Sequence, residues 1–315
     1  MNLRLNSKVA SVDPHGPSVT LQSGLSISAD LVIGCDGIKS VVRGYVLGHK
    51  NIPLAVPTGD VAYRAILPTE GMMGDPELQS FIENPEITCW MGPGKHLIGY
   101  RVSDGKEYNM VGIKRDNGST YSWTAEGDPA EMQAGYVGWE PRVQKLLSKV
   151  TTVLKSKLVI CNPLNTWIHG SGRVCLLGDA CHPMLPYRAQ GSAMAIEDAA
   201  VLGNLFSRLS SYSEIPDLLQ AYQDIRLGRT ASAQAASNTN RENYHLEDGP
   251  EQEARDLLMK KAMMKELEEM ASENKDNPNA WSDRAKSAET FDYDADAAVE
   301  KWWDEHGGAM RISRL

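Results

Sequence analysis

The feature of this sequence that most constrains its fold is a pair of short apolar runs that each stop at a glycine and an aspartate. Residues 31–33 lead into Gly-Cys-Asp-Gly, and residues 174–177 lead into Gly-Asp. Such a run is typical of a buried strand that enters a tight turn. Helices are predicted after both turns, over 40–46 and 191–207, and the second is apolar almost all round, which predicts burial. The two strand-turn-helix units therefore predict an α/β domain.

The residues between these two units have a different texture. Gly, Pro and Asp separate short β-favouring runs at 61–67, 86–91, 96–102 and 109–114. This pattern predicts a mostly antiparallel sheet in a second, inserted domain, with a helical stretch that breaks at Pro141. The first domain is then discontinuous. We expect its two parts over 1–50 and 168–240, the sheet domain over 51–167, and an acidic helical region over 241–315.

Charge and apolar content exclude several classes of partner. The net charge of −9 is concentrated near the C-terminus, because residues 241–306 carry 19 acidic and 9 basic side chains. The remainder is close to neutral, so no nucleic-acid partner is expected. We interpret the acidic region as a solvated helical surface. Apolar residues at helical spacing over 251–272 predict a helix within it whose apolar stripe packs against the rest of the chain.

The five cysteines are irregularly spaced and include no Cys-x-x-Cys pair. This spacing favours neither a disulfide framework nor a zinc site, so we expect no metal and a reduced, cytoplasmic setting. No stretch approaches the run of about 20 apolar residues that a membrane span needs. Residues 1–10 contain no continuous apolar core, so they are not expected to form a signal peptide.

The second strand-turn-helix unit has the chemistry of a cofactor cradle. Asp179 follows a buried strand, where a carboxylate is well placed to accept hydrogen bonds from sugar-type hydroxyls. Gly191 begins the next helix, and a glycine there lets backbone N–H groups approach a ligand closely. The positive end of that helix would stabilise negative charge on the ligand. The alternative is that Gly-Asp merely ends a strand and caps a helix.

Taken together and in this order, the two motifs resemble the Asp-Gly and Gly-Asp fingerprints of class A flavoprotein monooxygenases, which have the p-hydroxybenzoate hydroxylase fold. Residues 29–43 and 172–199 carry the resemblance, and residues 59–64, 90–100 and 108–111 support it. The sequence is most similar to salicylate-hydroxylase-like fungal enzymes that hydroxylate phenols, over roughly residues 1–240. The resemblance implies a glutathione-reductase-type FAD-binding domain, an inserted β-sheet substrate domain and a C-terminal helical tail.

The resemblance assigns six residues to the cofactors. Asp179 would bind the FAD ribityl chain, and Gly191 and Ser192 would face the pyrimidine edge of the flavin. Ser192 stands where the family commonly has alanine. The Asp-Gly motif, here Asp36, Gly37 and Arg43, is tied in the family to the FAD pyrophosphate and to NAD(P)H.

The resemblance places the catalytic pair in the inserted sheet. Arg64 and Tyr100 match the residues that orient and ionise the substrate in fungal phenol hydroxylases of this kind. The open alternatives are that Arg64 pairs with an acid and that Tyr100 caps a core. His96 lies on the same strand as Tyr100, either as part of the site or as a hydrogen-bonded strand histidine, and His182 is interpreted as structural.

The implied activity is hydroxylation of a phenolic substrate by O₂, with FAD, NAD(P)H and a flavin C4a-hydroperoxide, in fungal secondary metabolism. The flavin supplies the chemistry, and the protein supplies orientation and exclusion of water. Two alternatives remain open. Related folds also catalyse epoxidation or Baeyer–Villiger oxidation, and the chain could be a non-catalytic remnant that binds a partner or a small aromatic molecule.

The remnant alternative arises because this sequence departs from the family at one motif. The family opens with a strand, a Gly-x-Gly-x-x-Gly turn and a helix. The two near-matches, at 92–97 and 170–175, have Leu97 and Cys175 at the third glycine position. We therefore expect an N-terminally incomplete FAD-binding domain, explained by an incomplete gene model, a shortened isoform, or altered use of FAD.

Overall fold

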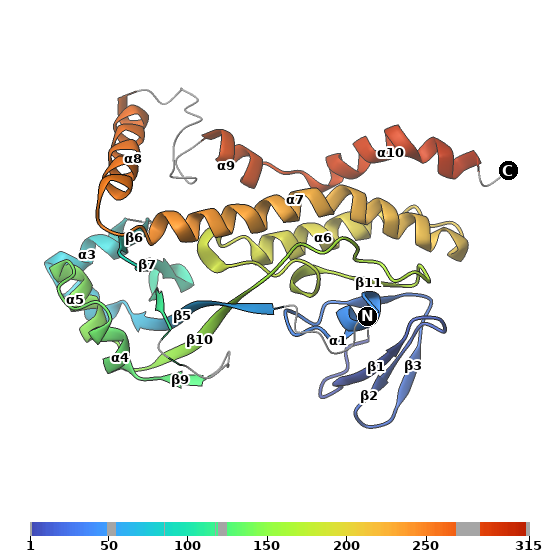
Figure 1. Ribbon diagram of the computed structural model, residues 1–315, viewed down its shortest axis with the longest axis horizontal. Helices are drawn as coiled ribbons and strands as arrows, with labels where there is room; N and C mark the ends of the chain where they lie inside the picture. Colours follow the sequence, from blue (N-terminus) through green and yellow to red (C-terminus); the bar gives the residue numbers. More distant parts are fainter. Residues whose placement is uncertain are drawn as a thin grey trace. The chain divides into compact units, whose positions relative to one another are not determined.

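The computed structural model describes residues 2–48, 55–84, 86–116, 118, 125–268 and 284–312. The chain divides into two compact units (Figure 1). The first unit contains residues 1–56, 160–240 and 284–315, and the sheet unit contains residues 57–159 and 241–283. The C-terminal residues, expected from the sequence as one region over 241–315, are thus shared between the two units. Among the described helices, none combines the length and apolar character that a membrane crossing requires.

The first unit joins the two strand-turn-helix units in one sheet. β4 (Val32–Gly34) pairs in parallel with β11 (Val174–Leu176). This pairing confirms the α/β fold class predicted from the two apolar runs. α1 (Val41–Val46) follows β4, and α6 (Gly191–Phe206) follows β11 after two short 3-10 turns. The other strands and α-helices described in this unit are β1 (Val9–Asp13), β2 (Ser18–Leu21) and β3 (Ser26–Ser28), which form an antiparallel sheet, and α7 (Ile215–Tyr244), α9 (Arg284–Phe291) and α10 (Ala295–Ile312).

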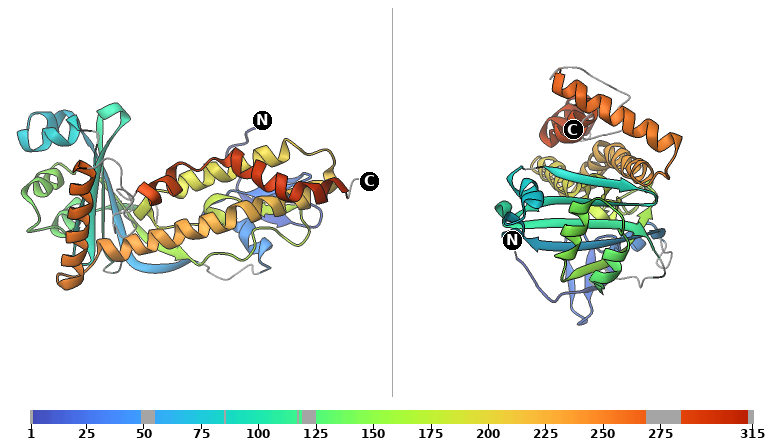
Figure 2. Two further views of the ribbon diagram at one scale, coloured as in Figure 1. Left: turned by 90° about the horizontal axis from the view of Figure 1, so that it is seen from above. Right: turned by 90° about the vertical axis from the view of Figure 1, so that its left-hand side faces the viewer.

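Two elements of the first unit are less buried than predicted. β11 is fully buried, but Ile33 in β4 is 42% exposed. α6 packs by one face only, because Met194, Val201 and Leu205 are buried while Ile196 is 70% exposed. Both views in Figure 2 show α6 beside α7, which covers that buried face. The prediction that α6 is buried all round was wrong, since the pattern of apolar residues does not show how many sides of a helix find a neighbour.

The sheet unit contains a six-stranded sheet in the order β6-β7-β8-β5-β10-β9. Its strands are β5 (Ala55–Pro68), β6 (Ile87–Gly92), β7 (Lys95–Val102), β8 (Glu107–Arg115), β9 (Ala125–Gly127) and β10 (Val153–Cys161). One face is covered by apolar side chains from α2 (Glu70–Met73), α3 (Pro76–Glu83), α4 (Pro129–Ala134) and α5 (Pro141–Ser148). The right-hand view of Figure 2 shows α4 and α5 lying against that face. Pro141 begins α5, as expected for the first turn of a helix.

The last helix of the sheet unit, α8 (Pro250–Glu268), corrects a prediction. The apolar stripe expected to pack is exposed, since Leu257, Leu258, Met263 and Met264 each retain 40–54% of their accessible surface. The helix instead buries Arg255 and Ala262, which lie seven residues apart and therefore share one face. Arg255 Nη1 donates a hydrogen bond to the Asn243 carbonyl at 2.5 Å. The side chain of Leu267, and Met270, lie outside the described residues.

Candidate functional site

The parallel pairing of β4 with β11 brings the Asp-Gly and Gly-Asp motifs to the same edge of the sheet. Arg43 connects them through its guanidinium group. Its Nη1 donates to the carbonyl of Ala180 at 3.1 Å, and its Nη2 donates to the carbonyl of Ile38 at 2.5 Å. Arg43 is only 6% exposed. The residue predicted to serve the cofactors therefore also fixes the distance between the two motifs.

Asp36 accepts hydrogen bonds from groups at the start of α1. Its carboxylate accepts hydrogen bonds from the hydroxyl of Ser40 at 2.5 Å and from the N–H groups of Val41 and Val42 at 2.7 and 3.1 Å. The N–H groups of Val41 and Val42 are among the donors that a helix start leaves without partners. Gly37 has a φ of +75°, which favours glycine at this turn. Contact of Asp36 and Gly37 with a cofactor remains a prediction.

Asp179 and Gly191 lie together at the start of α6. A Cβ atom placed on Gly191 would lie 3.8 Å from Asp179 Oδ1, so the glycine leaves space beside the carboxylate. Asp179 accepts no hydrogen bond from the residues that the structure describes, and burial raises its pKa. Ser192, in the first turn, is exposed. The first α6 amide bonded to a preceding carbonyl is that of Met194, which leaves earlier amides available to a ligand. An open carboxylate facing free helix amides suits a ligand with both hydroxyl and acceptor groups, as FAD has.

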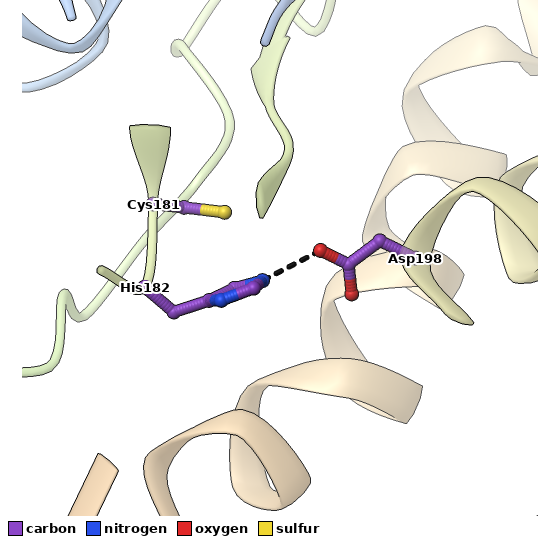
Figure 3. A group of neighbouring side chains, drawn as sticks. All are labelled: Cys181, His182 and Asp198. Carbon is purple, nitrogen blue, oxygen red and sulfur yellow. Dashed lines mark hydrogen bonds and ion pairs between the residues drawn. The ribbon is translucent and has the colours of Figure 1, made fainter. Parts of the chain in front are cut away.

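A buried hydrogen-bond network behind this cradle was not predicted. Asp198 is fully buried in α6, where its Oδ2 accepts from Gly178 N at 3.1 Å and contacts His182 Nε2 at 2.5 Å (Figure 3). Its Oδ1 accepts from Arg226 Nε at 2.8 Å. Burial alone would raise the pKa of Asp198, but the hydrogen bond with His182 and the charge of Arg226 outweigh burial and hold it below its usual value. The network therefore holds the turn that presents Asp179, and it supports the structural interpretation of His182.

Cys181 lies beside this network, and its sulfur and the His182 and Asp198 ligand atoms all lie within 4.8 Å of one another. A divalent cation would need a deprotonated thiol and an available carboxylate. Burial raises the pKa of Cys181 well above its usual value, and both Asp198 oxygens already accept hydrogen bonds. The buried guanidinium of Arg226 also repels a cation. We therefore interpret this group as a hydrogen-bond network.

The sheet unit places Arg64 and Tyr100 on one face of the sheet. Arg64 of β5 pairs with Val111 of β8, and Tyr100 of β7 pairs with Asn109 of β8. Residues 109 and 111 are two positions apart and point to the same face, so Arg64 and Tyr100 do as well. This face is opposite to the one that α3, α4 and α5 cover, where the neighbouring residues Tyr63 and Ala65 are buried.

Arg64 is held by a side chain that sequence reasoning missed. Its Nη1 donates to Ser156 Oγ of β10 at 2.8 Å, and Ser156 is 1% exposed. Burial lowers the pKa of Arg64, and the nearby Tyr100 opposes that shift. Arg64 forms no ion pair with an acid among the described residues. The structure therefore does not support the alternative that Arg64 pairs with an acid. Arg64 and Ser156 are 92 positions apart in the sequence, and no local pattern relates them.

His96 proves to be a hydrogen-bonded strand histidine. It is 1% exposed, and its Nδ1 lies 2.8 Å from Nε2 of His245. Its ring also packs edge-on against Tyr244. Burial, together with His245, lowers the pKa of His96 well below its usual value. Of the two alternatives for His96, the structure therefore supports the structural one.

The His96–His245 pair predicts a loss of stability in acid. Burial lowers the pKa of His245 to about 4, against about 6.5 in an unfolded chain. The unfolded state thus binds more protons below pH 6.5, and stability falls as the pH drops toward 4. We expect a loss of about 2 kcal/mol between pH 7 and pH 5, measured by urea unfolding. His245→Asn should flatten this dependence and His15→Asn, at an exposed site, should not; equal slopes in both variants would contradict the prediction.

The fold and the cradle are those of an α/β domain built for a nucleotide cofactor. Comparison with known families matches residues 9–237 to the FAD binding domain. FAD-dependent monooxygenase OpS4 of Beauveria bassiana is 36% identical over 95% of this chain and 68% of that protein. 6-Hydroxynicotinate 3-monooxygenase of Bordetella bronchiseptica is 34% identical over 76% of this chain and 60% of that protein. A salicylate hydroxylase in complex with substrate superposes with a TM-score of 0.72 at 25% identity, over 94% of this chain and 69% of that one.

These matches show that the chain belongs to the class A FAD-dependent aromatic monooxygenases. The family resemblance and the fold class expected from the sequence are thereby confirmed. The chain spans about two thirds of the length of OpS4 and of the salicylate hydroxylase, and less of the 6-hydroxynicotinate enzyme.

Proposed function

We propose that this chain belongs to a monooxygenase that uses FAD and NAD(P)H to hydroxylate a phenolic ring in fungal secondary metabolism. The observation that carries the proposal is the pair of Arg64 and Tyr100 on one face of the sheet. The relatives that support it are the FAD-dependent monooxygenase OpS4 of Beauveria bassiana and a monooxygenase whose name specifies 6-hydroxynicotinate, a hydroxylated aromatic ring.

The first unit supplies the groups that would hold FAD. Asp179 would accept hydrogen bonds from ribityl hydroxyls, and the first amides of α6, at Gly191 and Ser192, would donate to the pyrimidine edge. When bound and reduced, FAD supplies the activated oxygen. The network of Asp198, through Gly178 N, keeps the turn before Asp179 in place.

The sheet unit supplies the groups that would act on the substrate. A half-buried guanidinium favours the charged form of a phenol and lowers its pKa. The phenolate is the more nucleophilic form. Arg64 would hold that oxygen, Tyr100 would donate a second hydrogen bond, and Ser156 would keep Arg64 in position. These residues do no redox chemistry; they set the protonation state and the orientation of the ring.

FAD titration separates the enzyme from a non-catalytic remnant. Because this sequence contains no Gly-x-Gly-x-x-Gly turn, we expect weak but measurable FAD binding. The quenching of flavin fluorescence measures this binding. Asp179→Ala should weaken binding about 10- to 100-fold, the cost of a charge-assisted hydrogen bond, and Arg64→Ala should leave it unchanged. Absence of any binding would favour the remnant, and stoichiometric FAD retained through purification would contradict the expected weakness.

A further inference from the structure

We propose that the first unit carries a second binding site, for a small aromatic monocarboxylate, in a cavity of about 390 Å³ lined by residues of α6, α7 and α9. This site lies entirely within the first unit, whereas Arg64 and Tyr100 lie in the sheet unit. The inference goes beyond the proposed function, because it requires neither flavin nor turnover.

The anion would bind to Arg188. Its Nη2 donates to Thr290 Oγ1 at 2.8 Å, and no carboxylate of the described residues forms an ion pair with it. The other arginine of the cavity is already neutralised, since Arg229 binds both oxygens of Glu197 at 2.7 and 2.8 Å. Arg188 therefore leaves guanidinium N–H groups for a carboxylate, the anion that this planar group binds best.

Gln190 supplies an independent observation that points to a ligand. It is 5% exposed and lines the cavity, yet its side-chain amide makes no hydrogen bond with the residues that the structure describes. Neither amide atom is fully shielded from solvent, so both are open to a hydrogen-bonding ligand in the cavity. A carboxylate on Arg188 would offer Gln190 an acceptor.

The other residues that line the cavity favour a ligand with a flat apolar ring and a single charge. Met194, Ala233 and Ala236 line it; the two alanines leave room for a ring, and a methionine sulfur interacts favourably with aromatic edges. Glu289 also lines the cavity and is exposed. Its negative charge disfavours a ligand with two negative charges, such as phosphate, more than it disfavours a monocarboxylate. The volume is near the lower end of the ~300–1,000 Å³ range of ligand pockets, which suits one ring.

Calorimetric titration of the chain with benzoate tests the site. We expect saturable binding, at least tenfold weaker binding of benzamide, and no competition by inorganic phosphate. Arg188→Gln should weaken benzoate binding at least tenfold, and Ala236→Phe should abolish it by filling the cavity. Arg4→Gln, at an exposed site of the first unit, is the matched control, and circular dichroism checks that each variant folds.

The same titration of Arg64→Gln distinguishes this site from the proposed substrate site. Binding that survives Arg64→Gln and is lost in Arg188→Gln supports the cavity, whatever the outcome for hydroxylation. Binding that is lost in Arg64→Gln and unchanged in Arg188→Gln and Ala236→Phe overturns the proposal. The absence of benzoate binding, or equal affinity for benzamide, also overturns it.

Discussion

Arg64→Ala and Tyr100→Phe are expected to retain bound FAD but to lose hydroxylation when the chain is joined to the Gly-x-Gly-x-x-Gly segment of a relative. Loss of a buried, charge-assisted contact to the reacting group typically costs about 2–4 kcal/mol, or roughly 30- to 1,000-fold in rate. NAD(P)H oxidation should continue and release peroxide. The measurements are NAD(P)H consumption, peroxide and hydroxylated product on a panel of phenols.

Three further variants sharpen this test. Arg64→Lys should restore only part of the rate, because an ammonium cannot reproduce the guanidinium fork. Ser156→Ala should have an intermediate effect on KM and kcat, since it frees Arg64 without removing it. Arg115→Ala removes an exposed arginine of the same sheet and should leave hydroxylation unchanged. Hydroxylation at the parent rate in both Arg64→Ala and Tyr100→Phe would disprove the site assignment, even within this family.

Asp198→Ala should destabilise the chain by about 3–5 kcal/mol, the usual cost of breaking a buried ion pair. Arg226 is fully buried and would lose its bond to Asp198. The Gly178 amide and His182 would lose their acceptor at the same time. Chemical denaturation measures the effect, and far-UV circular dichroism shows whether any fold remains.

Glu300→Ala provides the control for Asp198→Ala. Glu300 pairs with Arg208, but its side chain is 59% exposed, so its loss should cost no more than about 1 kcal/mol. Because the pKa of Asp198 is lowered in the folded state, its contribution is present above the unfolded value of about 3.9 and is lost as the pH falls further. Equal destabilisation by the two substitutions would show that the network contributes little.

The parts of the fold that were predictable from the sequence depend on local patterns. A short apolar run that ends at Gly-Asp marks a strand and its turn, and Pro141 marks a break between helices, without knowledge of any distant residue. The exposure of Ile196 and Met263 was not predictable in this way. An apolar residue can lie on a face that no neighbour covers, and only tertiary packing decides which face that is.

The residues of the candidate site also divide into those that the sequence predicted and those that only tertiary contacts reveal. Arg64 and Tyr100 were found through family resemblance, and their shared face follows from strand register. Ser156 and the partners of Asp198 left no trace in the sequence, because each pair joins segments that are distant along the chain or lie on different elements. The sequence around a strand serine or a helix aspartate does not show whether that side chain binds an arginine.

The hydrogen bonds of Arg43 have a consequence for how variants of this protein can be built. One guanidinium donates hydrogen bonds to the carbonyls of both Ile38 and Ala180. The two motifs are therefore held together although they are far apart in the sequence. Both acceptors are backbone carbonyls, so a graft of residues 36–43 from a relative should fit only if it keeps an arginine at position 43. Chimaeras that lose this arginine should therefore be less stable even when residues 178–180 are unchanged, and denaturant unfolding would measure the loss.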